Sequence, residues 1–189
     1  MPIVAHSSPW YPKVRVEFPI SGLGFGSGLG MYLSTFDASI DARGRVLVPS
    51  SFRSTLGNTQ KFFLYPSADG GGYLEGGGQD LMDEYVQILK NLPPTARDRR
   101  AFVMAIFSKG GEVPMDQAGR ASIPEKLLAT AGIEKELLFV GAMDRFQIWN
   151  PDRYAAYEAE MSDYAEANQD ALHQPFYETK GRSGPGGEL

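Results

Sequence analysis

The stretch DARGRVLVP, residues 41–49, is followed later in the chain by DQAGRASIP, residues 116–124. Asp, Gly, Arg and Pro stand at the same internal positions in both stretches. Each of these residues is separated from its match by the same number of residues, and we call this separation the repeat offset. The same offset continues downstream, where Gly57 aligns with Gly132 and the apolar run FFL aligns with LLF. A register kept over about 25 residues without a gap indicates an internal duplication of one structural unit.

Each copy is predicted to form a strand, a turn, a second strand, a short helix and a third strand. The pattern D-x-x-G favours a tight turn, because Asp bonds to backbone two residues on and Gly accepts a positive φ. Pro49 and Pro124 stand where the short helices begin, and Gly57 and Gly132 stand where they end. The apolar runs KFFLYP and ELLFVG then predict the third strands.

Two helices are expected between the copies. Asp80 is the predicted N-cap of a helix over residues 81–92, and Thr95 is the predicted N-cap of a helix over residues 96–108. The first unit with its helix is therefore assigned to residues 31–92, and the second unit with its helices to residues 93–173.

Asn150 and Pro151 predict the start of a last helix that reaches about His173. An apolar stripe runs along one side of it at near-heptad spacing: Tyr154, Tyr157, Met161 and Tyr164. This stripe is expected to pack on the chain's own helices or on a neighbouring subunit.

The two ends of the chain differ in composition from its middle. Residues 1–30 are poor in charge and rich in Gly, Ser and Pro, so they are interpreted as a flexible leader or as sequence before a true start at Met31. Their glycine run SGLGFGSGLG lacks the helix that must follow a phosphate-binding loop. Residues 174–189 are predicted to be disordered.

The composition is that of an ordinary globular protein and excludes several kinds of site. The 189 residues are 42% hydrophobic and 22% charged, and none is cysteine, which excludes disulfides, thiol nucleophiles and cysteine metal sites. The two histidines, His6 and His173, stand towards the ends, so no metal site, cofactor or Ser-His-Asp triad is expected. No long apolar run or signal sequence is present, and a cytoplasmic protein is predicted.

Charge is distributed unevenly along the chain. The net charge is −5, but residues 31–66 carry four basic side chains against two acidic ones. Residues 144–189 carry nine acidic side chains against four basic ones. The first copy is therefore a basic island in an acidic chain, which favours an anionic partner for this copy.

Two interpretations of the Asp–Arg pair in each turn are open from the residues alone. In the first, Asp41 and Arg45 only stabilise the turn, a contribution of about 0–1 kcal/mol for an exposed pair. In the second, the turn holds an arginine on a rigid backbone and directs it at a partner. Arginine suits bidentate recognition of phosphate or of guanine.

The segment IDARGRVLVPSSFRSTLG, residues 40–57, resembles the AbrB/SpoVT swapped-hairpin DNA-binding motif. Two such motifs with RDRR between them, and the ending LLFVGAMDRFQIWNPDRY, are similar to the MraZ family of bacterial transcription regulators. The resemblance covers about residues 31–165. One departure is the run Gly76–Gly78, where that family places a strand end and an aromatic residue.

The resemblance implies an α+β fold: a pseudo-two-fold, duplicated swapped-hairpin β-barrel with flanking helices. It implies a ring-shaped homo-oligomer, associated with the nucleoid, that binds double-stranded DNA. The expected targets are direct repeats in the promoter of the division and cell-wall gene cluster, including the protein's own promoter. No enzymatic activity is expected.

Carried over residue by residue, the family's motif gives the turn residues Asp41, Gly44, Asp116 and Gly119. It gives as DNA-binding residues Arg43, Arg45, Arg53 and Arg120. The second copy has Ala118 and Leu128 in place of two of these arginines. DNA contact is therefore expected mainly from the first copy, with the second as structural half and subunit contact.

Two other classes of function are weighed against DNA binding. An oligomeric scaffold that binds protein and no nucleic acid would fit an acidic chain whose Asp–Arg pairs are structural. An enzyme would need carboxylates placed for acid–base work, whereas those of this chain stand in predicted turns and on a solvated helix.

Overall fold

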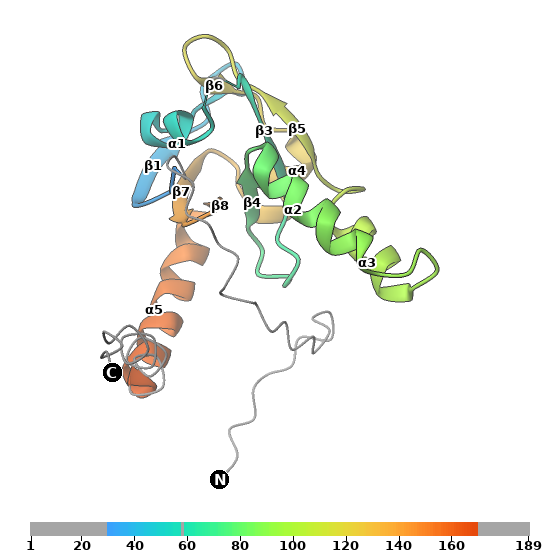
Figure 1. Ribbon diagram of the computed structural model, residues 1–189. Coiled ribbons are helices and arrows are strands. Elements are labelled where there is room, and N and C mark those ends of the chain that lie inside the picture. Colours follow the sequence, from blue (N-terminus) through green and yellow to red (C-terminus); the bar gives the residue numbers. More distant parts are fainter. Residues whose placement is uncertain (1–29, 58, 170–189) are drawn as a thin grey trace, which may run out of the picture. The chain divides into compact units, whose positions relative to one another are not determined.

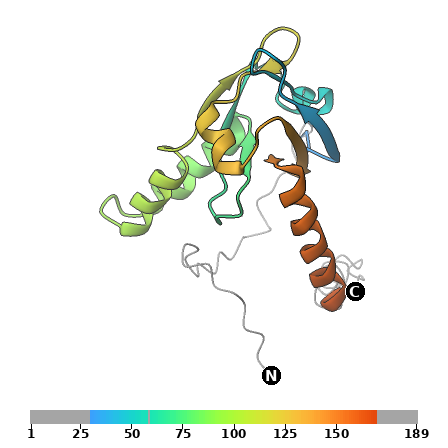
Figure 2. The same ribbon diagram turned by 180° about the vertical axis from the view of Figure 1, so that it is seen from behind.

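The computed structural model describes residues 30–57 and 59–169 (Figures 1 and 2). Almost all of the predicted leader, and the predicted disordered tail, lie outside these residues. The chain divides into two compact units, one ending at Pro151 and one beginning at Asp152. No helix in the described part is long and apolar enough to cross a membrane.

The first unit is built on an antiparallel sheet of six strands with helices around it, so the predicted α+β class is confirmed. In spatial order the strands are β1 (Thr35–Ser39), β7 (Glu136–Ala142), β8 (Arg145–Trp149), β4 (Leu74–Gly77), β3 (Lys61–Pro66) and β5 (Gly111–Pro114). Two short strands, β2 (Val46–Leu47) and β6 (Arg120–Ala121), form a separate antiparallel pair.

Strand pairing is exchanged between the two halves. β1 of the first half pairs with β7 of the second, and β5 of the second half pairs with β3 of the first. The registers are equivalent at the repeat offset, since Phe36 lies opposite Phe139 and Gly111 lies opposite Leu64. This exchange is what a swapped-hairpin duplication requires, although the duplication itself stays a prediction.

The closed barrel expected from the sequence is not seen among the described strands. β1 and β5 are the two ends of the strand order, and no pairing joins them. The strands that follow the turns, β2 and β6, are only two residues long and pair with each other. They are therefore too short to continue the ladder from one edge of the sheet to the other.

Four helices lie in the first unit and one in the second, as far as the chain is described: α1 (Ser50–Thr55), α2 (Gln79–Lys90), α3 (Arg97–Ala105), α4 (Glu125–Ala131) and α5 (Pro151–Ala167). The short helices α1 and α4 follow Pro49 and Pro124 as predicted. Gly132 ends α4 in the left-handed conformation, with φ 66°, which agrees with its predicted role.

The predicted caps of α2 and α3 are wrong. α2 begins after Gly78 and places Asp80 in its first turn, where the side chain of Gln79 donates to Asp83 at 2.9 Å. α3 begins after Ala96, one residue beyond Thr95. Neither helix start has a side-chain cap bond.

The apolar core lies between the halves and is rich in aromatic rings. Phe52, Phe139 and Phe146 are fully buried and pack with ring centroids 5.5–6.1 Å apart. Gly76 of β4 lies opposite Phe146 of β8, and a Cβ atom on Gly76 would approach the Phe146 ring to 2.5 Å. The strand therefore forms despite its glycines, because a ring from the second half fills the space of the missing side chain.

α2 packs against the sheet through a small polar network. The hydroxyls of Tyr65 on β3 and Tyr85 on α2 are 2.7 Å apart, and Arg145 of β8 donates to Tyr85 at 2.7 Å. Both tyrosines are buried. The network thus ties the helix of the first half to a strand of the second.

The second unit is described only as α5 and the two residues after it. On this helix Met161 and Tyr164 are exposed in the single chain. Packing of the predicted stripe on a neighbouring subunit stays a prediction.

Candidate nucleic-acid interface

The two D-x-x-G-R segments form the same turn. In the first, Asp41 N–H donates to the Arg45 carbonyl at 2.7 Å, and Gly44 N–H donates to the Asp41 carbonyl at 2.9 Å. In the second, the equivalent distances are 2.8 and 2.9 Å. Gly44 and Gly119 have φ values of 73° and 80°, which only glycine adopts readily. The sequence therefore predicted both turns correctly.

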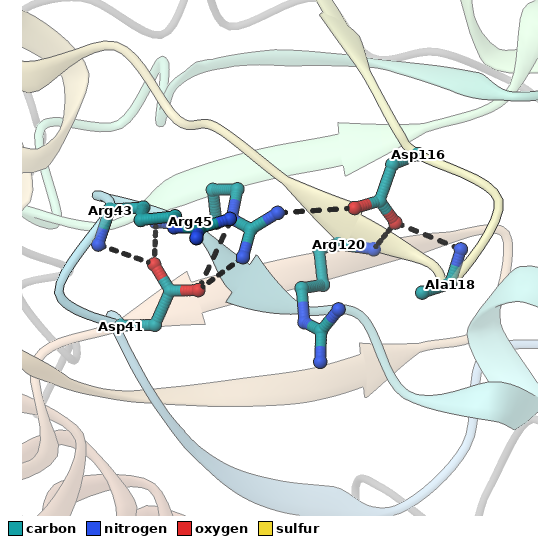
Figure 3. A network of polar contacts seen from close by, with 6 residues as sticks. All are labelled: Asp41, Arg43, Arg45, Asp116, Ala118 and Arg120. Atoms are coloured by element: carbon teal, nitrogen blue, oxygen red, sulfur yellow. Dashed lines mark hydrogen bonds and ion pairs between the residues drawn. The ribbon is translucent and has the colours of Figure 1, made fainter.

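One carboxylate oxygen of each aspartate holds its turn closed. Oδ1 of Asp41 accepts from the backbone N–H groups of Arg43 and Arg45, both at 2.9 Å. Oδ1 of Asp116 accepts from those of Ala118 and Arg120 at 2.9 and 2.8 Å (Figure 3). These bonds stabilise the ionised carboxylates.

The pKa values of both aspartates fall as a result. The backbone N–H of Arg45, followed by its side chain, lowers the pKa of Asp41 from 3.8 to about 2. The backbone N–H of Arg120 is the largest cause of the lowered pKa of Asp116. Both carboxylates are therefore ionised at neutral pH.

The β2–β6 pair places the two turns side by side. Val46 lies opposite Ala121 and Leu47 lies opposite Arg120, so the arginine of each motif lies at this short ladder. Two turns that stand far apart in the sequence thus form one edge of the molecule, and we call the segments 41–45 and 116–120 the paired turns.

Arg45 is bonded to both aspartates of the paired turns. Its Nε and Nη2 donate to Oδ2 of Asp41 at 3.2 and 2.9 Å, and its Nη1 donates to Oδ2 of Asp116 at 3.4 Å (Figure 3). The side chain of Arg45 is 26% exposed. The contact between Arg45 and Asp116 crosses from one half to the other and is not predicted by the motif.

Arg120, the equivalent of Arg45, is held differently. Its backbone N–H bonds to Asp116, but its guanidinium makes no hydrogen bond or ion pair with any described residue. The same holds for the guanidinium of Arg43. Both side chains are exposed. The paired turns therefore carry two guanidinium groups that are open to an external acceptor.

Arg53 lies against the turn of the opposite half. Its Nε donates to the Val48 carbonyl at 3.1 Å, and a Cβ atom on Gly119 would lie 2.5 Å from its Cδ. Above Gly44 the equivalent space is empty. Arg53 is therefore partly buried and helps to hold the second turn, a contact that the basic pattern alone does not predict.

The structure brings the predicted residues together at one edge but gives them unequal contacts. The repeat could have indicated that the two turns lie side by side, since paired copies of one unit place each turn beside its copy, but it does not indicate which arginine contacts which aspartate. In the described part, no group of three or more histidine or carboxylate side chains is placed to bind a metal ion.

Comparison with known proteins agrees with the resemblance seen in the sequence. The family model described as "MraZ protein, putative antitoxin-like" matches residues 106–174. A protein of Hyphomonas neptunium named transcriptional regulator MraZ is 36% identical over 163 residues, which cover 84% of this chain and 99% of the relative. The chain belongs to the MraZ family.

Other relatives carry the same name. The protein of Ligilactobacillus salivarius is 36% identical over 142 residues, covering 75% of this chain and 94% of the relative. That of Caulobacter vibrioides is 32% identical over 143 residues, covering 75% and 91%. The 163-residue match to the Hyphomonas neptunium protein is long enough to include both turns of this chain.

Proposed function

We propose that this chain is a DNA-binding transcriptional regulator and that the paired turns are its DNA-facing edge. The observation that carries the proposal is the placement of two rigid D-x-x-G-R turns side by side, with exposed guanidinium groups on both. The names of the relatives, transcriptional regulator MraZ, support the same function.

The geometry suits recognition of DNA for a physical reason. An arginine at the end of a hydrogen-bonded turn loses little backbone freedom on binding, and its planar fork matches phosphate and the O6 and N7 atoms of guanine. We assign direct contact to Arg43, Arg45 and Arg120. We assign Arg53 to holding the second turn in place, because its side chain bonds to the Val48 carbonyl and lies against Gly119.

We further propose that the fold is a swapped-hairpin duplication and that the protein assembles into a ring. The exchanged strand pairings support the first statement. The proposed ring assembly rests on the expected affinity for DNA, because a single edge with few arginines neutralises few phosphates and binds weakly. Several edges linked in a ring bind several DNA repeats at once and gain by effective concentration.

The proposed targets are direct repeats in the promoter of the division and cell-wall gene cluster, including the protein's own promoter. The protein would then act in the cytoplasm, at the nucleoid. We base these targets on the resemblance of this chain to the MraZ family.

The test is selection of bound duplexes from a random pool by the full chain, followed by titration of the enriched duplex at two salt concentrations. We expect an enriched repeat and binding that weakens as salt rises. Arg45→Ala and Arg120→Ala are then compared, each first checked for unchanged assembly. Loss of a base contact should cost about 1–3 kcal/mol.

Arg43→Ala serves as the phosphate-contact comparison. If Arg43 touches phosphate, its loss should weaken binding to all sequences and flatten the salt slope by about one unit. No enrichment, together with no salt-dependent binding to any duplex, would contradict the proposal. That result would favour the alternative of an oligomeric scaffold without nucleic acid.

A further inference from the structure

The two aspartates of the paired turns use their second carboxylate oxygen differently. Oδ2 of Asp41 accepts two bonds from Arg45, which belongs to its own turn. Oδ2 of Asp116 accepts from the same arginine, across the boundary between the halves. In the described part of the chain, neither carboxylate bonds to the guanidinium of Arg120.

Arg45 has one fully occupied edge and one partly occupied edge. Nε and Nη2 face Asp41 and form a two-point contact. Nη1 faces Asp116 at 3.4 Å, which is longer than the 2.9 Å bond to Asp41. A guanidinium offers five N–H donors in a fixed plane, so the Nη1 side is the one with donor capacity left for a further acceptor.

We propose that Asp116 is an internal competitor for Arg45: its Oδ2 occupies the guanidinium side that a DNA acceptor needs, and binding of DNA exchanges this carboxylate for a base or phosphate oxygen. The inference rests on the proposed DNA-binding function. It assigns Asp116 a role besides closing its own turn, and it makes the second half a regulator of the arginine of the first.

The contact between Arg45 and Asp116 is weak enough to be exchanged for a contact with DNA. The Asp116 side chain is 41% exposed, so a released carboxylate remains hydrated, and exposed ion pairs of this kind are weak. Asp41 keeps Arg45 in place throughout, because its two bonds lie on the other edge of the guanidinium. Exchange therefore changes the partner of Arg45 without displacing its backbone.

The competition has a consequence for selectivity. A phosphate that merely passes near Arg45 meets a guanidinium already neutralised by two carboxylates, and it is also repelled by Asp116. An acceptor placed within hydrogen-bond reach of Nη1 replaces Asp116. Asp116 is expected to weaken binding to all DNA, and to weaken binding to unselected duplexes more than binding to the selected one.

The decisive variant is Asp116→Asn. The amide keeps an oxygen at the Oδ1 position, so it still accepts from Ala118 and Arg120 and retains the turn. Its NH₂ group cannot accept from Arg45. We expect the variant to bind the selected duplex about two- to fivefold more tightly, the factor that an exposed ion pair is worth, with a larger gain on a scrambled duplex.

Two controls separate exchange at Arg45 from a general effect of charge. Asp37→Asn removes one exposed carboxylate that has no bond to a described residue, and it should leave the affinity nearly unchanged. Asp116→Asn in an Arg45→Ala background should give a clearly smaller gain, namely the part that comes from the field of Asp116 alone. A gain as large there as in the presence of Arg45 would show that Asp116 acts only through its field and would overturn the inference.

Other outcomes are equally decisive. If the wild-type chain binds no duplex, the proposed function and this inference both fail. If it binds, and Asp116→Asn binds with unchanged or lower affinity, only this inference fails. Should the Asn variant not assemble, Asp116→Ser, whose hydroxyl also accepts from the backbone in such turns, supports the same comparison.

Discussion

The two halves of the molecule share a backbone but not its side-chain contacts. Both turns are closed by the same aspartate bonds and the same positive-φ glycine. Yet Arg45 is bonded to two carboxylates, whereas the guanidinium of Arg120 is bonded to no described residue. The comparison shows that two turns with the same backbone hydrogen bonds can hold their arginines in different contacts.

The same division is present in the sheet. Gly76 on β4 lies opposite Phe146 on β8, so a residue without a side chain in one half accommodates a large ring from the other. Neither residue is the repeat equivalent of the other. The halves are therefore complementary and not interchangeable, and each prediction below tests one such complementary pair.

The largest effect is expected from Phe146→Ala. The ring is fully buried and packs on Phe52, Phe62 and Phe139. Its loss should lower the free energy of unfolding by about 3–5 kcal/mol, the usual cost of removing a buried aromatic ring. Chemical denaturation monitored by circular dichroism measures it.

A double variant sharpens this test. Gly76→Ala alone should destabilise the fold, because the added Cβ would lie 2.5 Å from the Phe146 ring. The same change in the Phe146→Ala background should cost much less, since the ring is gone. Equal costs in both backgrounds would show that the ring and the glycine do not complement each other.

A smaller effect is expected at the two turn glycines. Gly44→Ala should lower the free energy of unfolding by about 1–2 kcal/mol, because its φ is positive and alanine is strained there. Gly119→Ala should cost more, since its Cβ would also meet Arg53. In an Arg53→Ala background, Gly44→Ala and Gly119→Ala should lower the free energy of unfolding by similar amounts. A difference that remains in that background would show that Arg53 does not cause it.

The sequence predicted the backbone of the paired turns because Asp, Gly and Pro restrict local φ and ψ directly. It did not predict the contact between Arg45 and Asp116, because the motif describes only residues within one turn. Nor did it predict how Arg53 packs on Gly119. These contacts depend on how the two halves meet, and a local pattern carries no such information.

The sheet was predictable only as far as the repeat stays in register. Phe63 pairs with Gly77, whereas its repeat equivalent Leu138 pairs with Trp149. The repeat equivalent of Gly77 is Asp152, which lies beyond the end of β8. The first half therefore has the longer connection, and the repeat offset no longer aligns β4 with β8. Because of this shift, aligning the two copies at the repeat offset does not predict that Gly76 lies opposite Phe146.

A still smaller effect is expected when each arginine of the motif is removed without DNA present. Arg45→Ala should lower the free energy of unfolding by about 0–1 kcal/mol, as expected for partly exposed ion pairs. Arg120→Ala should leave it unchanged, because its guanidinium bonds to no described residue. Denaturation of both variants side by side gives the comparison, and equal losses would show that the arginines are equivalent in the free protein.

The finest test is the acid titration of the two turns. The pKa of Asp41 is lowered from 3.8 to about 2, first by the backbone N–H of Arg45 and then by its side chain. A lowered pKa means that the folded state favours the ionised carboxylate, so its contribution to stability is complete above pH 3.8 and is lost as the pH falls towards about 2. Carboxyl carbon resonances in NMR spectra follow this ionisation directly.

Asp116 provides the internal comparison for that titration. Its pKa is also lowered, with the backbone N–H of Arg120 as the largest cause, but it has no side-chain bond from the arginine of its own turn. Arg45→Ala should therefore raise the pKa of Asp41 clearly and that of Asp116 only slightly, because Arg45 reaches Asp116 through one long contact. Equal rises of the two pKa values would mean that Arg45 interacts equally strongly with Asp41 and Asp116, which would contradict the difference between its contacts to the two aspartates.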